Sequence, residues 1–377
     1  MHVVDRGLVF DATQAEAVRR FCTFTSIVRL YNGKLLVSFR TGSAKDSADE
    51  NVMIVGSDDE GKTWRRVSGG WETGYPPGSG WRFRALGLSE PVPGRLLGLG
   101  MAVNRAGPPR PFANPQTQGI LPQKVMVSVS HDEGRTWAPF EEVDLRPHRG
   151  NATTGDILTL KDGTLALPYE AWKEYDDASP GEHHASLRLS ADGGQTWPDL
   201  SIVVHDPTGR LLFWDQRLSV SPDDGRLIAL FWTHDRQAQQ DVPMHVAWGS
   251  PDGREWTQPI STGLEGQICM PLALPGRRVL GAYVHRHDPP SLRAVLSNDF
   301  GRTWEVADEL VFYCKARGGG ESGMAGKRDF ADYWADMSVW TFGHPAATPL
   351  PHGDVMIVYY AGDEQAMGVH WVRVAID

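Results

Sequence analysis

Ser57-Asp58-Asp59-Glu60-Gly61-Lys62-Thr63-Trp64 is the first of five copies of one motif in this chain of 377 residues. Four copies follow the pattern Ser-x-Asp-x-Gly-x-Thr-Trp, and the copy at Ser250 is one residue shorter, with Glu255 before the Trp. The pattern is typical of a hairpin turn, because Asp accepts hydrogen bonds from the turn backbone, Gly supplies a positive φ and Thr returns the chain to a strand. We expect each Trp to bury its ring between neighbouring sheets. The copies begin at Ser57, Ser130, Ser190, Ser250 and Ser297, and their regular recurrence indicates a repeat architecture.

A second repeat consists of a turn glycine followed by an apolar strand. It occurs six times, at Gly33, Gly94, Gly163, Gly225, Gly276 and Gly353, and each of the first five precedes a Ser-x-Asp motif. The sixth is followed by 369–374, which lies where the next strand is expected. The spacing predicts an all-β, six-bladed β-propeller of four-stranded antiparallel blades. We expect the opening run 3–10 to supply the fourth strand of blade six and close the ring.

The repeats span nearly the whole chain, so we expect residues 1–377 to form a single propeller domain. The exception is an insertion at about 305–340, before blade six, which includes Gly318-Gly319-Gly320. A phosphate-binding loop would need a different glycine pattern, so we interpret the insertion as a flexible lid or an inter-blade segment.

The bulk properties exclude several classes of function. A net charge of −10 and a pI near 5.7 argue against binding to nucleic acid or to a membrane surface. The N-terminus lacks the apolar stretch of a signal peptide. The three cysteines are scattered and odd in number, which favours reduced thiols and a cytoplasmic location. The oligomeric state stays open.

The polar residues of the repeats gather on one end of the predicted disc. The glycine turns and the Ser-x-Asp turns share one face, so the loops after each second strand and before each first strand share the opposite, funnel face. The loops on the funnel face are rich in Arg, carboxylate, His and Trp side chains. This mixture suits an acidic sugar, because Trp packs on ring faces and Arg binds a carboxylate. The candidate catalytic residues there are Asp49, Glu170, Asp215, His344 and Tyr360. The candidate substrate-binding residues are Arg40, Trp172, Lys173, Arg217, Gln267 and Arg286, and Trp81 and Arg82 lie at another entry to the funnel.

The five motifs match the Asp box, and the chain resembles the sialidase superfamily of Asp-box propellers over essentially its whole length. The resemblance implies three Arg that hold a substrate carboxylate, an Asp acid/base, and a Tyr nucleophile activated by a Glu. The Arg of the first strand is expected near 22–25, which holds no Arg. His344 occupies the place of the Tyr, and 153–156 occupies that of the Glu. The acid/base Asp corresponds to Asp46 or Asp49.

Three functions follow as hypotheses. The first is a glycoside hydrolase acting on an acidic or sialic-acid-like sugar, with Glu170 and Asp215 as an acid/base pair. The second is a uronate-specific lyase, in which Arg neutralises the carboxylate and His344 acts as base, with Tyr360 or Tyr313 as acid. The third is a carbohydrate-binding propeller without catalysis.

Two histidine pairs raise the question of a metal. In His285-x-His287 both rings face the same side of a strand, and His183-His184 is a second pair. The sequence spacing fixes no third ligand for either pair. We therefore expect neither a metal nor a cofactor.

Overall fold

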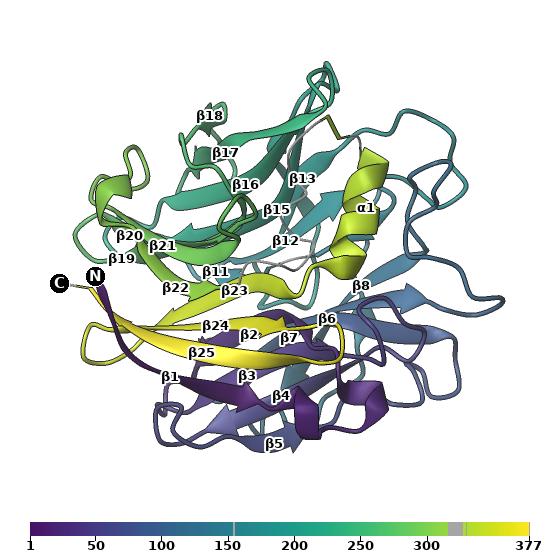
Figure 1. Cartoon of the computed structure of the whole chain (residues 1–377), viewed down its shortest axis with the longest axis horizontal. Coiled ribbons are helices and arrows are strands. Elements are labelled where there is room, and N and C mark those ends of the chain that lie inside the picture. The colour runs from purple at the N-terminus through teal and green to yellow at the C-terminus, as the bar shows by residue number, and fades with distance from the viewer. Residues whose placement is uncertain (154, 316–326, 329, 377) are drawn as a thin grey trace.

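The computed structural model describes residues 1–153, 155–315, 327–328 and 330–376. Within them the strands form six antiparallel sheets, drawn from the side in Figure 1. Each sheet contacts the next and the last contacts the first, which confirms the predicted six-bladed propeller. Blade one consists of β2 (Thr23–Arg29), β3 (Leu35–Thr41), β4 (Asn51–Ser57) and β5 (Arg65–Ser68). Blade two consists of β6 (Trp81–Val92), β7 (Arg95–Asn104), β8 (Gln123–Ser130) and β9 (Glu141–Glu142). Blade three consists of β10 (Asn151–Ala152) with β11 (Leu158–Thr159), β12 (Leu165–Ala171), β13 (His184–Ser190) and β14 (Asp199–His205). Blade four consists of β15 (Leu211–Val220), β16 (Leu227–Asp235), β17 (Gln240–Gly249) and β18 (Ile260–Ser261). Blade five consists of β19 (Gln267–Leu274), β20 (Arg278–His285), β21 (Ser291–Ser297) and β22 (Leu310–Cys314). Blade six consists of β23 (Phe342–Pro349), β24 (Val355–Gly362), β25 (Met367–Ala375) and β1 (His2–Phe10).

The ring closes as the sequence predicts. The N-terminal strand β1 pairs antiparallel with β25, with Val3 opposite Val374 and Gly7 opposite Trp371. The two termini lie at the same edge of the disc, where the purple β1 runs beside the yellow β25 (Figure 1). The opening run therefore completes blade six.

Each full Asp box is held by hydrogen bonds within its own turn. In the first box the carboxylate of Asp59 accepts from the amide and the hydroxyl of Thr63, at 2.8 and 2.7 Å, and the hydroxyl of Ser57 accepts from the amide of Gly61 at 2.8 Å. Gly61 has a φ of 90°, which a side chain would strain. The short copy has no Thr before its Trp, so Asp252 accepts from the Arg254 amide at 3.2 Å instead, and it keeps the bond from the Ser250 hydroxyl that the full boxes also have.

The hydrophobic core forms layers between neighbouring blades. Each layer combines side chains of two or more blades, and the Trp of each Asp box packs against the layer shared with the preceding blade. Central strands such as β3 and β16 are buried along their whole length, because a sheet lies on each of their faces. The five Trp are Trp64, Trp137, Trp197, Trp256 and Trp304, and the predicted role of their rings is confirmed.

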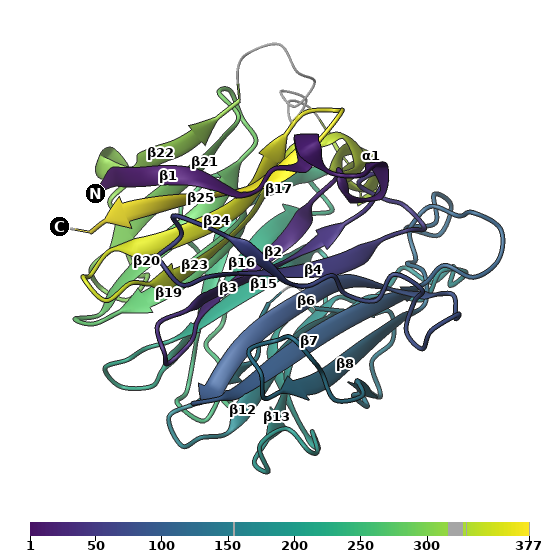
Figure 2. The same cartoon turned by 90° about the horizontal axis from the view of Figure 1, so that it is seen from below.

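The two ends of the disc differ. The glycine turns join the first and second strands of a blade and the Asp boxes join the third and fourth, so both lie at one end. The helix α1 (Phe330–Val339) lies on the far side from the two termini (Figure 2). The segment expected as an insertion at 305–340 contains η3 (Val306–Asp308), β22 and α1, so its first part completes blade five. The triglycine 318–320 lies outside the described residues. Two further 3-10 turns, η1 (Ala12–Gln14) and η2 (Ala17–Arg19), follow β1.

None of the helices in the described part of the chain has the length and apolar character needed to cross a membrane.

Candidate active site

The innermost strands share an irregularity at the funnel end. In five blades the first strand slips in register against the second strand, which marks a β-bulge. Bulges bend a strand and redirect a side chain, and they are common beside active sites. The side chains at these five slips all line one central cavity; they are Phe24, Arg84, Asp215, Ile268 and His344. The inner strands therefore present one side chain per blade to a ligand.

Four of these bulge residues have a backbone conformation that non-glycine residues rarely adopt. Their φ angles are 52° at Phe24, 48° at Asp215, 33° at Ile268 and 45° at His344. Such strain persists only where the surrounding structure enforces it, and it clusters at binding and catalytic sites. The cavity is accordingly the first candidate for the functional site.

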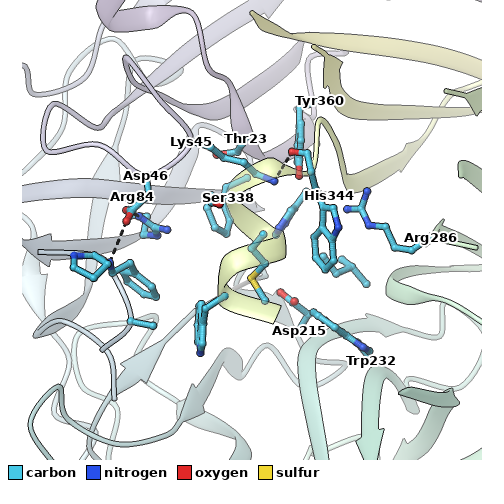
Figure 3. A pocket seen from close by; sticks show the side chains of 18 of the residues that line it. Thr23, Lys45, Asp46, Arg84, Asp215, Trp232, Arg286, Ser338, His344 and Tyr360 are labelled. Atoms are coloured by element: carbon cyan, nitrogen blue, oxygen red, sulfur yellow. Dashed lines mark hydrogen bonds and ion pairs between the residues drawn. The ribbon is translucent and has the colours of Figure 1, made fainter. Parts of the chain in front are cut away.

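The cavity has two lobes that share several lining residues. Figure 3 shows side chains that line the first lobe. The first lobe has a volume of about 350 Å³ and the second about 140 Å³. Helix α1 covers both lobes with Trp334 and Met337. Aromatic side chains form much of the wall, and they include Phe24, Phe112, Trp172, Trp214, Trp232, Tyr333, Trp334, Trp340 and Tyr360. A planar or apolar face of a ligand therefore has several rings to pack against.

His344 lies among positive charges. Burial lowers the pKa of His344 well below its ordinary value, and nearby cations lower the pKa further. These cations are Arg217, Lys45, Arg286 and Arg84. The imidazole is therefore neutral, and the excess positive charge around it suits an anionic group of a ligand.

The guanidinium of Arg217 fixes the tautomer of His344. Its Nη2 lies 2.9 Å from Nδ1 of His344. Because a guanidinium only donates, Nδ1 accepts this hydrogen bond and the proton of the neutral ring is on Nε2. His344 is therefore a hydrogen-bond donor at Nε2 rather than the free base that the sequence suggested.

A buried ion network supports Arg84 from below. The carboxylate of Glu50, which is fully buried, accepts hydrogen bonds from Arg84 and Arg105 at 2.7 Å and from Arg40 at 2.9 Å. Burial acts to raise the pKa of Glu50, but the three guanidinium groups outweigh it and lower the pKa. The network holds Arg84 rigidly at the cavity wall.

Asp46 belongs to the same network. Burial acts to raise its pKa, but Arg84 and Arg105 lower the pKa to about 2. Asp46 also accepts from the amide of Phe112 at 3.0 Å. A carboxylate that stays ionised at neutral pH cannot serve as a general acid, so Asp46 does not fill the acid role that the resemblance implied.

The structure brings together Asp215 and Glu170, which the sequence paired as acid and base. Both line the second lobe, and Asp215 also lines the first. Burial, and then the negative charge of Glu170, raise the pKa of Asp215 to about 7, against the opposing charge of Arg217. Glu170 is held by the amide of Gln216, which donates to Oε1 at 2.6 Å, and its Oε2 lies 3.5 Å from Nε2 of His183. Two carboxyl groups with different environments thus face one cavity.

Several other predicted residues also reach the cavity. Tyr360 lines the first lobe, with Nζ of Lys45 5.3 Å from its ring centroid. Trp172 lines the second lobe and donates from Nε1 to the carbonyl of Gln118 at 2.8 Å. Arg286 lines the first lobe, where its guanidinium lies 4.2 Å from the ring centroid of Trp340.

Five predicted residues lie away from the cavity walls. Arg40 is fully buried against Glu50, and Arg217 lies behind His344, so neither guanidinium is presented to a ligand as expected. Asp49 accepts from the amide of Ser43 at 3.1 Å, and Nζ of Lys173 folds back onto the carbonyl of Ser179. The amide of Gln267 donates to Asp241 at 3.2 Å and lines a small side pocket with Arg286.

Sequence reasoning missed two cations of the cavity wall. Arg84 lies two residues beyond Arg82, and the bulge in β6 directs its side chain into the cavity. Lys45 donates to the carbonyl of Trp340 at 2.6 Å and thereby joins blade one to the end of α1. An Arg or Lys near a strand entry is a detectable signal, but the bulge that selects one position is not visible in the repeat pattern.

Comparison with known proteins places the fold but not the activity. No family model matches the chain, and no curated protein matches it in sequence. The chain is similar in structure to a protein of unknown function from Dyadobacter fermentans, with 20% sequence identity, a TM-score of 0.72, and coverage of 100% of this chain and 99% of that one.

Two sialidases are similar as well. The Hadza microbial sialidase Hz136 has 18% identity and a TM-score of 0.66, over 98% of this chain and 68% of that chain. The sialidase of Trypanosoma rangeli, in complex with the inhibitor DANA, has 11% identity and a TM-score of 0.64, over 98% of this chain and 59% of that chain. The chain therefore has the six-bladed propeller fold of sialidases.

Proposed function

We propose that the protein is a glycoside hydrolase that removes a small acidic or sialic-acid-like sugar, with Asp215 as the general acid. The observation that carries this proposal is the pair of carboxyl groups in the second lobe. Glycoside hydrolysis requires one protonated and one ionised carboxyl group beside the scissile bond. With a pKa raised to about 7, Asp215 keeps its proton at the pH at which an ordinary Asp has lost it.

The cations around His344 support an acidic substrate. Lys45, Arg84 and Arg286 line the first lobe, where they would neutralise a sugar carboxylate. Nε2–H of His344 would add a hydrogen bond from a neutral ring. Structural relatives named as sialidases bind acidic sugar derivatives, such as 2,3-difluoro-KDN in the enzyme of Trypanosoma rangeli. Here the bulge of blade one carries Phe24 in the region where the resemblance implied an Arg, so the cations come from other blades.

Glu170 would supply the second carboxyl group. As a nucleophile it would form a glycosyl ester, and the product would keep the configuration of the substrate. As a base it would activate a water molecule, and the configuration would invert. Product stereochemistry, measured by NMR immediately after cleavage, assigns the role.

The geometry favours hydrolysis over the lyase alternative. A lyase needs a base to remove the proton beside the carboxylate, and the sequence offered His344 for this task. Its Nδ1 already accepts a hydrogen bond from Arg217, and its Nε2 carries the proton. Asp215 and Glu170 have no such conflict with their roles in hydrolysis.

Leaving-group dependence tests the role of Asp215. We expect Asp215→Asn to lower the cleavage rate of an alkyl glycoside by about 100- to 10,000-fold, because the alkoxide must be protonated as it leaves. The same variant should cleave a 4-nitrophenyl glycoside of the same sugar much closer to the wild-type rate, because nitrophenolate leaves without a proton. Equal losses on both substrates would remove Asp215 from the acid role.

A further inference from the structure

A second cluster of titratable side chains lies at the funnel end of blade three. His184 begins β13 and stands directly opposite His205, which ends β14. Glu182 precedes His184 by two residues, which places both on the same face of an extended chain. One possible ligand atom from each residue lies within 4.8 Å of the others, and Nε2 of His184 is 3.7 Å from Oε2 of Glu182. His183, between them, faces the cavity instead.

The histidine rings of this cluster form a stack. The centroids of His184 and His205 are 3.9 Å apart, and His148 lies on the other side of His184 at 4.7 Å. Neutral imidazoles with available lone pairs are the form that binds metal ions.

The hydrogen bond of His205 leaves one nitrogen for a ligand. Its Nδ1 lies 3.1 Å from the carbonyl oxygen of His183. Because a carbonyl only accepts, Nδ1 carries the proton and Nε2 presents its lone pair. A backbone carbonyl that orients a histidine in this way is the usual second partner of a metal-ligating imidazole.

We propose that Glu182, His184 and His205 form a binding site for Zn²⁺. Two imidazole nitrogens and one carboxylate oxygen are a ligand set that Zn²⁺ accepts, with water in the fourth position. Tetrahedral ligands at Zn²⁺ stand roughly 3.3 Å apart, so the ligand atoms, which lie within 4.8 Å of one another, must close by at most about 1.5 Å. The side chain of Glu182 is 81% exposed and has room to turn.

A metal at this site would stabilise one wall of the second lobe of the cavity. It would tie the end of the loop 172–183 to the outer strand β14. This loop carries Trp172 and His183, which both line the second lobe. The sequence predicted no metal because His205 becomes a neighbour of His184 only through the pairing of β13 with β14.

Zinc binding to the purified, tag-free protein tests the site. All variants carry Cys314→Ser, because Cys314 is an exposed thiol and thiolates are zinc ligands. After dialysis against EDTA, ZnCl₂ is titrated by calorimetry, and CoCl₂ is used as a probe whose visible spectrum reports coordination. We expect one Zn²⁺ per chain, and a weakening of at least about tenfold in His205→Ala and in Glu182→Gln. His131→Ala is the control, because His131 is an exposed histidine on the Asp-box face.

Glu182→Gln guards against misfolding, since an exposed carboxylate is replaced by an amide of the same shape. The weakest metal-binding modules have dissociation constants on the order of 1 mM. If the folded protein binds no zinc at about 1 mM ZnCl₂, the proposal is therefore overturned. Equal binding by His205→Ala, Glu182→Gln and His131→Ala would overturn it too. These measurements need no substrate, so the zinc site and the proposed hydrolase activity stand or fall separately.

Discussion

The two ends of the propeller are built by different physical rules. On the Asp-box face each turn is held by hydrogen bonds between residues at most five positions apart, and in four blades the same bond recurs, from the Thr amide to the Asp carboxylate. On the funnel face the bonds join distant segments, such as Arg217 to His344 and Lys45 to Trp340. Local bonds repeat because the motif repeats. The cavity differs from blade to blade because each bulge presents a different side chain.

The largest expected effect compares one Asp from each face. Asp215→Asn should lower kcat/KM for an alkyl glycoside by about 100- to 10,000-fold, because the general acid is lost. Asp192→Asn, in the Asp box of blade three, should leave kcat/KM unchanged and lower Tm, because it disturbs the hydrogen bonds to Thr196. Steady-state kinetics and thermal unfolding of both variants check this. Similar kinetic losses in the two would mean that the faces are not separated in function.

A second comparison concerns two glutamates in ion pairs. Glu50→Gln should lower the free energy of unfolding by about 3–5 kcal/mol, because three guanidinium groups lose their buried counter-ion. Glu60→Gln, which removes a half-buried partner of Arg373, should cost at most about 1 kcal/mol. Urea unfolding of both variants measures the difference. A loss under about 1 kcal/mol in Glu50→Gln would show that water reaches the network.

Arg217 is a positioning residue, and its loss should act through His344. We expect Arg217→Gln to lower kcat/KM by about tenfold, because Nδ1 of His344 loses its donor. The pKa of His344 should also rise, since a nearby cation is removed. Arg226→Gln, at the glycine turn of the same blade, is the matched control. An unchanged ¹⁵N titration of His344 in Arg217→Gln would contradict this role.

Stability should depend on pH through Asp215. Its pKa is raised in the folded state, so its contribution to stability is present below the unfolded pKa near 3.8 and is lost as the pH rises towards 7. Asp215→Asn should therefore raise Tm at pH 8 and leave it nearly unchanged at pH 4. Asp49→Asn should not raise Tm at pH 8, because the pKa of Asp49 is lowered by bonds to Ser47 and Ser43 against the effect of burial. Equal Tm shifts at pH 4 and pH 8 would show that the folded protein does not raise the pKa of Asp215.

The smallest effect separates two neighbours in sequence. Lys173→Ala should change kcat/KM by less than about twofold, because Nζ bonds to the loop rather than facing a ligand. Trp172→Ala removes part of the wall of the second lobe and should raise KM by about tenfold. A larger change of kcat/KM in Lys173→Ala would show that Lys173 contacts the substrate, as the sequence suggested.

The repeats in the sequence were sufficient to predict the blades. Asp boxes and glycine turns are local patterns, so they place every hairpin and the strand that closes the ring. They could also place Asp215, Glu170 and His344 at the funnel end, because these residues follow or precede a predicted strand. The bulges that turn Arg84 into the cavity and Arg217 behind His344 depend on packing across blades, so the pattern of one blade carries no sign of them.

Product analysis in heavy-oxygen water tests the proposed hydrolysis most directly. The purified protein is incubated with a panel of acidic glycans in H₂¹⁸O, and the released sugars are analysed by mass spectrometry, with Asp215→Asn as the control. We expect an acidic monosaccharide that carries ¹⁸O and is absent from the control. An unlabelled product lighter by one water would identify a lyase, and the absence of any product across the panel would contradict the proposed hydrolase.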